Sequence, residues 1–187
     1  EHALYKIENE LNKYFFKIPI ISILGDVCDK TQLMSIIKKY KIDTLFHAAA
    51  YKHVPMIEKN AVEGFKNNVI GTLCCIEASI RTSIKNFVLI STDKAVRPTN
   101  VMGATKRVSE MLVQAYAEEN KTSSSNSKIK FSIVRFGNVL GSSGSVLPLF
   151  ENQIKSGGPI TLTHKEIVRY FMTIQEAAQL VIQASAI

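Results

Sequence analysis

The sequence lacks the features that would place it in a membrane or on a secretory route. No apolar run reaches the roughly 18 residues that a membrane-spanning helix requires. No secretory signal opens the chain either. The chain of 187 residues begins and ends inside helical patterns without a cap at either end, so we interpret it as a fragment of a longer protein.

Cysteine and concentrated charge are also scarce. Cys28, Cys74 and Cys75 show no metal-ligand spacing, which favours reduced, mostly buried thiols in a cytoplasmic setting. The formal net charge is +7, yet the lysines are spread along the chain without a dense basic block or interleaved aromatic residues. We therefore expect a solvated surface and no nucleic-acid partner. Basic side chains that converge on a phosphorylated small molecule also fit this charge.

The chain does contain a regular alternation of strand and helix patterns. Short apolar runs predict strands over residues 18–24, 43–50, 87–91 and 131–136. Helical spacing predicts helices over 1–13, 61–82 and 102–119, one that Thr31 caps, and one from Thr173 onward, while 120–128 is polar and of low complexity. This alternation predicts one α/β domain with right-handed crossovers and a parallel sheet covered on both faces.

Chemically active side chains follow each predicted strand. Such sheets bind ligands beyond the carboxyl ends of their strands. Asp26 follows the first apolar run, "HAAAYKH" the second, "STDK" the third and "GNVLGSSGS" the fourth. The sequence therefore predicts one ligand site at this edge of the sheet.

Two adjacent segments supply an acid, a base and an ammonium group to this edge. Ser91, Thr92, Asp93 and Lys94 lie at the carboxyl end of a strand, although a polar turn with an Asx-type bond is an alternative. In "MGATK", Met102 and Lys106 are four residues apart on a predicted helix and therefore share a face. We expect both segments to point into one cleft.

Five ordered motifs carry a resemblance to a known family. "HAAAYKHVP", "NNVIGT", "ISTDKAV", "NVMGATKR" and "RFGNVLGSSGSVLP" resemble the extended short-chain dehydrogenase/reductase superfamily, and within it the polysaccharide-biosynthesis (capsular type) branch of nucleotide-sugar 4,6-dehydratases. Most of the superfamily has Tyr-x-x-x-Lys where this chain has Met102 and Lys106. That departure is similar to the large, membrane-anchored bacterial UDP-N-acetylglucosamine 4,6-dehydratases.

The resemblance implies a Rossmann-like, doubly wound parallel sheet. We expect residues 1–187 to form one NAD(P)-binding domain that is incomplete at its N-terminal edge, with 137–172 contributing to the substrate side. The glycine-rich turn that holds the cofactor pyrophosphate is absent from the sequence and would lie upstream of Glu1. The strand end that distinguishes NAD from NADP would lie there too, so the cofactor is NAD or NADP.

The resemblance also implies which residues contact the cofactor. By position these are Asp26, Val27, Ala48, Ala49, Ala50, Asn68, Ser91 and Lys106. Tight helix–sheet packing is an equally compatible role for the three alanines. A structural hydrogen bond within its helix is an equally compatible role for Asn68.

The implied reaction removes water from C6 of a hexose. The hydride of C4 passes to the nicotinamide, the resulting ketone acidifies the C5 proton, and the hydride returns to C6. By the resemblance, Asp93 is the acid at the C6 oxygen and Lys94 the base at C5. Burial in a closed cleft favours the neutral forms that these roles require, while an ordinary ion pair is the competing state.

Other residues have predicted roles at the sugar nucleotide. A thioether has no proton to exchange, so Met102 is a packing residue and Thr92, through its hydroxyl or a water, is our candidate at the C4 hydroxyl. The resemblance and the charges assign substrate binding to Lys52, Asn138, Ser145, Val146 and Arg169, although Lys52 and Arg169 are equally compatible with solvated surface charges. His47 and His53 are ring donors near the site or structural histidines.

The function that fits these features is a UDP-N-acetylglucosamine 4,6-dehydratase, which would act in surface polysaccharide or glycoprotein glycan synthesis. The alternatives are a UDP-sugar 4-epimerase of the same superfamily and a non-catalytic nucleotide-binding Rossmann module. We expect a UDP-sugar as the ligand, and the sequence leaves a homo-oligomer open. We expect the complete protein at the cytoplasmic face of the bacterial inner membrane, anchored by segments outside these residues.

Overall fold

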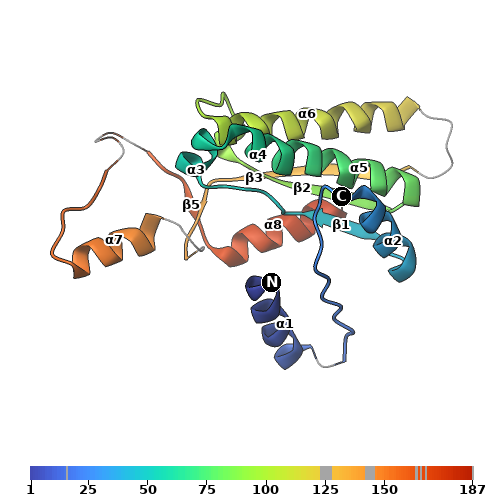
Figure 1. The fold of residues 1–187 in the computed structure, drawn as a ribbon, viewed down its shortest axis with the longest axis horizontal. Coiled ribbons are helices and arrows are strands. Elements are labelled where there is room, and N and C mark those ends of the chain that lie inside the picture. Colours follow the sequence, from blue (N-terminus) through green and yellow to red (C-terminus); the bar gives the residue numbers. More distant parts are fainter. Residues whose placement is uncertain are drawn as a thin grey trace.

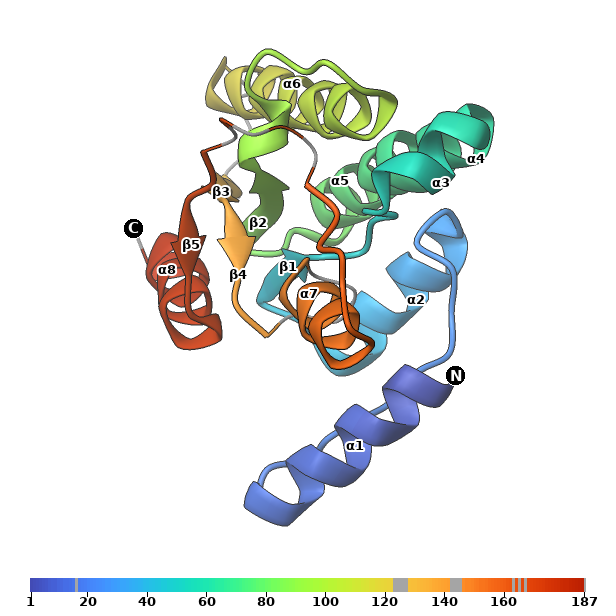
Figure 2. The same cartoon turned by 90° about the vertical axis from the view of Figure 1, so that its left-hand side faces the viewer.

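The computed structural model describes residues 1–15, 17–122, 128–141, 146–162, 164, 166 and 168–186. Figures 1 and 2 show how its elements are arranged. In chain order they are α1 (His2–Tyr14), α2 (Lys30–Tyr40), β1 (Thr44–His47), α3 (Val54–Lys59), α4 (Ala61–Phe65), the π-helical η1 (Lys66–Ile70), α5 (Gly71–Thr82), β2 (Asn86–Thr92), the 3₁₀ turn η2 (Asp93–Ala95), α6 (Val101–Thr122), β3 (Lys130–Phe136), β4 (Asn138–Val139), α7 (Val146–Lys155), β5 (Phe171–Met172) and α8 (Ile174–Ala186).

The main sheet is parallel, as the alternating pattern predicts. Its strand order is β1-β2-β3, and Phe46 of β1 is paired with Val88 of β2, which is paired with Ser132 of β3. Helices α5 and α6 contact the sheet from one side and α8 from the other (Figure 1). The prediction of a parallel sheet with helices on both faces is therefore confirmed.

Strand β2 lies at the centre of the hydrophobic core. Phe87, Val88 and Leu89 are three consecutive residues of β2, and each is 0% exposed. A strand covered on both faces buries neighbouring side chains rather than every second one. Ile76 of α5 and Val113 of α6 pack in the same core. This buried strand fixes where its polar carboxyl end, Ser91 and Thr92, emerges.

Three predictions of local structure were wrong. Residues 18–24 form no strand, because a strand needs a hydrogen-bonded neighbour and no described strand lies beside this segment. The cap of α2 is Asp29, whose side chain accepts a hydrogen bond from the Gln32 amide, and Thr31 lies inside the helix. Residues 120–122 of the predicted polar loop belong to α6.

Several elements carry no clear pattern in the sequence. Helix α3 and the short β4–β5 sheet were not predicted, and the single helix expected over 61–82 contains the π-helical segment η1. A β-carbon on Gly137 would lie 2.7 Å from the main-chain oxygen of Tyr170, so glycine allows the chain before β5 to approach β4 closely. None of the described helices is both long and apolar enough to span a membrane.

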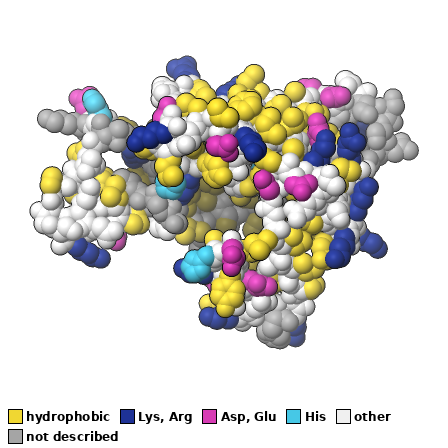
Figure 3. Space-filling view, viewed as in Figure 1, with side chains coloured by type: hydrophobic (Ala, Val, Ile, Leu, Met, Phe, Trp, Pro, Cys, Tyr) yellow, Lys and Arg dark blue, Asp and Glu magenta, His cyan; other side chains and the backbone are white. Residues whose placement is uncertain are grey.

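One surface is rich in exposed hydrophobic side chains. Figure 3 shows hydrophobic side chains gathered over the helices that lie above the sheet in Figure 1. On α3, α4 and α6, which contact one another, the exposed ones include Met56, Val62, Phe65, Val108 and Met111. Clusters of this kind are typical of surfaces that another protein segment covers.

Candidate active site

A cavity of about 410 Å³ lies at the carboxyl ends of the strands of the main sheet. This size is within the usual range for small-molecule sites. The predicted site residues that line it are Ala48, Ala50, Lys52, His53, Ser91, Thr92, Lys94, Met102, Lys106, Asn138 and Arg169. The structure therefore brings together residues from five segments of the chain at the edge of the sheet where we expected them.

Asp93 and Lys94 form an ion pair at the end of β2. Lys94 Nζ lies 3.1 Å from Asp93 Oδ1, and the Thr92 hydroxyl donates to the same oxygen at 2.8 Å. Lys94 and Thr92 line the cavity, and Asp93 is joined to it through both of them. The Lys94 side chain is 32% exposed and the Asp93 side chain 42%, so the pair is open to water.

The ion pair answers the question that the sequence left open. Burial raises the pKa of the Asp93 carboxyl, but the hydrogen bonds from Thr92 and Lys94 and the charge of Lys94 more than offset this, so its pKa lies below the ordinary value. The carboxyl is therefore ionised at neutral pH. The neutral pair that the implied reaction requires is not the resting state of this open cleft.

Met102 and Lys106 share the cleft face of α6, as their spacing predicts. Both line the cavity, and they are 4% and 6% exposed. Lys106 Nζ donates to the main-chain oxygen of Ile90 at 2.6 Å. Burial lowers the pKa of Lys106 to about 8, although the nearby Glu110 opposes this shift. Lys106 is therefore an amine that changes charge close to neutral pH.

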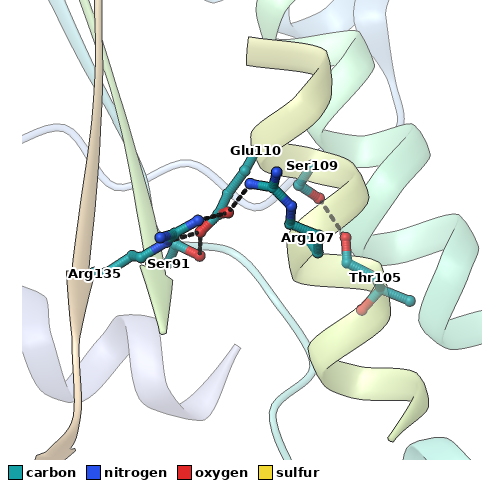
Figure 4. A network of polar contacts seen from close by, with 6 residues as sticks. All are labelled: Ser91, Thr105, Arg107, Ser109, Glu110 and Arg135. Atoms are coloured by element: carbon teal, nitrogen blue, oxygen red, sulfur yellow. Dashed lines mark hydrogen bonds and ion pairs between the residues drawn. The ribbon is translucent and has the colours of Figure 1, made fainter. Parts of the chain in front are cut away.

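A buried carboxylate network lies behind Ser91 (Figure 4). Glu110 is 0% exposed, and its Oε1 accepts hydrogen bonds from Ser91 Oγ at 2.6 Å and Arg135 Nε at 2.7 Å. Its Oε2 accepts from Arg135 and from Arg107. Burial raises the pKa of Glu110, but the hydrogen bonds from Arg135, Ser91 and Arg107 more than offset this and lower it.

Sequence reasoning missed this network. The available signal was the position of Glu110, four residues after Lys106 and hence on the same inward face of the helix. A carboxylate is rarely buried without partners. A search for a cationic partner of Glu110 would then have led to Arg135 in the strand predicted over 131–136.

Asn68 holds the loop after β1 in place. Its side-chain oxygen accepts from the Tyr51 amide at 2.8 Å, and its side-chain nitrogen donates to the Tyr51 carbonyl at 3.1 Å and to Thr105 Oγ1 at 3.0 Å. Asn68 is 1% exposed and lies in the π-helical segment η1. This geometry supports a structural role for Asn68. Its hydrogen bonds connect the helical segment to the loop after β1, in which Tyr51 lines the cavity.

His47 is structural in this arrangement. It is 3% exposed, and its Nε2 lies 2.9 Å from Thr72 Oγ1. The Thr72 hydroxyl donates to the Asn68 carbonyl at 2.6 Å, so the His47 ring is the donor to Thr72. Burial and the charge of Lys106 lower the pKa of His47 to about 4.

Some predicted site residues do not line the cavity. Asp26 accepts a hydrogen bond from the Cys28 amide, and Val27 packs against the core. Ala49 is exposed outside the cavity lining. Ser145 lies outside the described residues, and Val146 begins α7 but its side chain is not described. The predicted contacts of these residues with cofactor or substrate stay predictions.

The cavity is suited to an anionic ligand. Lys52, Lys94, Lys106 and Arg169 all line it, whereas none of its described lining residues is a carboxylate. A surface lined by one sign of charge attracts the opposite sign. The predicted placement of a diphosphate near Lys52 and Arg169 is compatible with this excess of cationic side chains.

The residues present also fit the nicotinamide end of a dinucleotide. Ala48 and Ala50 line the cavity directly after β1, and their small side chains leave the backbone accessible to a flat ring. Ser91 and Lys106 supply polar atoms to the lining of the same cavity. No group of side chains suited to a metal ion is found among the described residues.

Comparison with protein families and curated proteins gives clear matches. The family model for polysaccharide biosynthesis proteins matches residues 1–187. Over its whole length the chain is 50% identical to the capsular polysaccharide biosynthesis protein CapD of Staphylococcus aureus, of which it covers 30%.

Two similar proteins carry enzyme names. A UDP-glucose 4-epimerase of Rickettsia canadensis is 41% identical over 76% of the chain and 41% of its own length. A UDP-N-acetylglucosamine 4,6-dehydratase (inverting) of Campylobacter jejuni is 35% identical over 85% of the chain and 46% of its own length. The chain thus spans less than half the length of these curated relatives.

Solved structures confirm the predicted Rossmann-like fold. The X-ray structure of Pen from Bacillus thuringiensis matches with a TM-score of 0.86 and 38% identity, over 98% of this chain and 55% of that one. DesIV, a dTDP-glucose 4,6-dehydratase from Streptomyces venezuelae solved with NAD and TYD bound, matches with a TM-score of 0.79 and 20% identity, over 92% of this chain and 56% of that one. The likeness to DesIV is one of fold.

Proposed function

The chain belongs to the polysaccharide biosynthesis protein family of extended short-chain dehydrogenases/reductases, and on that premise we propose that it carries the catalytic cleft of a nucleotide-sugar 4,6-dehydratase. The proposed substrate is UDP-N-acetylglucosamine, and the product is a UDP-4-keto-6-deoxy sugar for surface polysaccharide or glycoprotein glycan synthesis. The observation that carries the proposal is the Asp93–Lys94 pair at the cavity, with 3.1 Å between its charged atoms.

An NAD-type cofactor is part of this proposal. When bound, a nicotinamide would accept the C4 hydride of the sugar and return it to C6. The chain's own residues would provide its seat, and these are Ala48, Ala50, Ser91 and Lys106 of the cavity lining. Asn68 would contribute by fixing the main chain of Tyr51, which lines the same cavity. The match to DesIV, which is solved with NAD bound, supports this choice of cofactor.

Asp93 and Lys94 would move protons on neighbouring carbons of the sugar. In the proposed roles, Asp93 protonates the departing C6 hydroxyl and Lys94 removes the C5 proton. Both roles need the neutral pair, which forms when one proton passes from Lys94 to Asp93 across their hydrogen bond. A sugar that excludes water from the cleft favours this transfer, because burial penalises two separated charges.

The remaining predicted contacts orient the sugar nucleotide. Lys52 and Arg169 would neutralise the diphosphate, and Asn138 would donate to the sugar or uridine from β4. Ser145 and Val146 belong to the same predicted substrate side, within residues 137–172. The basic lining of the cavity, free of carboxylates among its described residues, supports an anionic substrate.

A 4-epimerase is the second candidate. The 41% identity to a UDP-glucose 4-epimerase favours it. Epimerisation, however, needs no proton transfer at C5 or C6, so an acid and a base held together at the cleft would have no task. The non-catalytic nucleotide-binding module remains the third candidate, and it too would leave this pair without a role.

The test uses the complete protein, UDP-N-acetylglucosamine, and mass spectrometry of the nucleotide sugar. We expect wild type to give a product lighter by one water. Asp93→Asn and Lys94→Ala should slow this reaction roughly 10²- to 10⁴-fold, the usual effect of removing an acid or base. The matched controls are Asp43→Asn and Lys85→Ala, which break an exposed ion pair of 2.8 Å and should leave the rate unchanged. An isomer of unchanged mass would favour the epimerase, and no turnover would favour the binding module.

The proposal extends to location and assembly. Segments outside these residues would anchor the complete protein at the cytoplasmic face of the bacterial inner membrane. A homo-oligomer is supported by the exposed hydrophobic side chains on α3, α4 and α6. Membrane fractionation and light scattering of the detergent-solubilised complete protein test these two points separately.

A further inference from the structure

The proposed reaction needs a group that takes the proton of the C4 hydroxyl, and the structure narrows the choice. Met102, which stands where the superfamily has tyrosine, lines the cavity but has no exchangeable proton. The Ser91 hydroxyl donates to Glu110 at 2.6 Å, and the Thr92 hydroxyl donates to Asp93 at 2.8 Å. Each hydroxyl could therefore only pass a proton on to a carboxylate.

Neither carboxylate is suited to receive that proton. Glu110 already accepts hydrogen bonds from Ser91, Arg107 and Arg135, and these stabilise its ionised form. Asp93 already holds a proton in the neutral pair that the proposed reaction requires, because it has taken one from Lys94. It therefore cannot accept the C4 proton that Thr92 would pass on.

Lys106 differs from both hydroxyls. It is nearly buried, it lines the cavity beside Met102, and its described hydrogen-bond partner is the main-chain oxygen of Ile90. The nearest carboxylate along its helix, Glu110, has both oxygens engaged by the two arginines. Lys106 therefore has no carboxylate among its described hydrogen-bond and ion-pair partners, and a buried ammonium without a counter-ion is costly.

We propose that Lys106 itself, as a neutral amine, is the catalytic residue that takes the C4 hydroxyl proton, in place of the tyrosine that Met102 replaces. This inference rests on the proposed dehydratase function and assigns its first step. One N–H of the amine stays bonded to the Ile90 carbonyl, which orients Nζ and leaves its lone pair for the hydroxyl. The unreactive side chain of Met102 would keep water from that lone pair.

The step balances in atoms and charge. The C4 O–H bond breaks and an N–H bond forms at Lys106 Nζ, while the C4 hydride passes to the oxidised nicotinamide and C4 becomes a carbonyl carbon. The proton that Asp93 delivers at C6 leaves with the hydroxyl as water. Lys94 takes the C5 proton, and the Asp93–Lys94 pair returns a proton to C5 when the hydride reaches C6. At the end Lys106 holds one proton more and the pair one fewer, so a single proton exchanged through solvent resets the site.

The surroundings of Lys106 agree with an amine that is neutral for part of the time. On its own helix it faces Met102 and Glu110, and His47 of β1 is close enough for the charge of Lys106 to act on its pKa. Lys52, His53, Lys94 and Arg169 line the same cavity. Burial lowers the pKa of Lys106 to about 8, and the charge of Glu110, whose oxygens are held by arginines, opposes this shift only in part.

The test separates the C4 step from the C5 step. Dehydration of UDP-N-acetylglucosamine requires both steps, whereas the 4-keto product, incubated in D₂O, exchanges its C5 proton without any oxidation at C4. Lys106→Arg keeps a cation that cannot act as a base. We expect this variant of the complete protein to lose dehydration roughly 10²- to 10⁴-fold while C5 exchange stays within a few-fold of wild type. Lys94→Ala should lose both reactions.

Each other outcome overturns the inference in a recognisable way. Dehydration at the wild-type rate in Lys106→Arg would show that Lys106 is not the base. Loss of dehydration with intact C5 exchange in Thr92→Val, but not in Lys106→Arg, would assign the step to Thr92. Loss of both reactions in Lys106→Arg would indicate a positioning role. Absence of both reactions in wild type would remove the proposed function and this step with it.

A second measurement needs neither activity nor a variant that folds. Trace acetic anhydride labels neutral amines, and peptide mapping of the complete wild-type protein follows the labelling of Lys106 as pH rises. We expect half-maximal labelling at a pH of about 8, well below the pKa of roughly 10.4 of an ordinary lysine. A midpoint at the ordinary value would show an ammonium that holds its proton too tightly, and it would overturn the inference.

Discussion

Arg135 Nε lies 2.7 Å from Glu110 Oε1, and this contact joins strand β3 to helix α6 behind the cleft. A second hydrogen bond from the same guanidinium makes the pair bidentate, which is the strongest geometry for such a contact. The carboxylate also accepts a hydrogen bond from the hydroxyl of Ser91, which lines the cavity. The orientation of Ser91 therefore depends on a charge pair that does not line the cavity.

Removal of this buried carboxylate should destabilise the fold. Glu110→Ala leaves Arg135 and the Ser91 hydroxyl without their partner, and breaking a buried pair typically costs about 3 kcal/mol or more. Urea denaturation should show this loss. The matched control on the same helix is Glu118→Ala, which breaks an exposed pair with Lys121 of 2.7 Å and should cost less than about 1 kcal/mol. Equal losses in the two variants would contradict a structural role for the network.

His47 should make stability depend on pH on the acid side of neutrality. Its pKa falls from 6.5 to about 4 on folding, so the unfolded chain binds the proton more tightly than the native state does. Stability from this group is therefore complete above pH 6.5 and declines as pH falls toward 4. Each unit of difference is worth about 1.4 kcal/mol, which gives a total of about 3 kcal/mol.

The measurement is urea denaturation at several pH values, compared between wild type and His47→Gln. The variant should lose the slope between pH 6.5 and 4, because glutamine can still donate to Thr72 but does not titrate. His53→Gln, which changes an exposed histidine, should retain the slope. A slope that survives in His47→Gln would assign the pH dependence to another group.

Gly103 should be intolerant of a β-carbon. An added β-carbon would clash with the main-chain oxygen of Lys94, because α6 begins directly against the turn that carries the Asp93–Lys94 pair. Glycine to alanine normally stabilises a helix interior by roughly 0.5–1 kcal/mol, but here we expect a loss. Activity should fall further than stability, since the clash displaces Lys94. Ala104→Ser, at an exposed position of the same turn, should leave both unchanged. A stabilised and fully active Gly103→Ala would refute the close approach.

The sequence was sufficient to predict the strands β2 and β3 of the sheet but not to predict which apolar runs join it. Strands β2 and β3 were predicted within about one residue at each end, because each has a compact apolar run, and that of β2 records burial on both faces. Residues 18–24 have the same apolar composition, yet a ladder also requires a neighbour that local composition does not reveal. Local patterns therefore predicted where the chain is buried better than they predicted which strands pair.

The same limit applies to the cleft. Lys94, Met102 and Lys106 could be placed there because strand ends and helical spacing fix direction. Glu110 and Arg135 could not, since their contact joins elements 25 positions apart and leaves no local pattern. The charge state of Asp93 was also out of reach, because it depends on the orientation of the Thr92 and Lys94 side chains.

Asn68→Asp should loosen the loop that lines the cavity. Aspartate can still accept from the Tyr51 amide, but it cannot donate to the Tyr51 carbonyl or to Thr105. The buried Thr105 hydroxyl loses its donor, at a cost of about 1–3 kcal/mol, and the partly buried bond to the Tyr51 carbonyl is lost as well. Asn60→Asp is the matched control, because it removes the same kind of amide-to-carbonyl bond at an exposed site. Urea denaturation should distinguish the two variants, and an equal cost would contradict the role of Asn68 as the clamp on this loop.

Met102→Leu should be nearly neutral for the chemical step. The two side chains have similar volumes, and a swap of this kind in a packed site usually costs less than about 1.5 kcal/mol. Because the thioether has no proton to exchange, we expect dehydration within a few-fold of wild type and an unchanged pH dependence. Met102→Gln is the matched polar control, since it has similar length but brings an amide beside Lys106, so it should lower the rate. A loss in Met102→Leu as large as that in Lys106→Arg would mean that the sulfur itself takes part in the step. Lys106 would then not be sufficient to explain removal of the C4 proton.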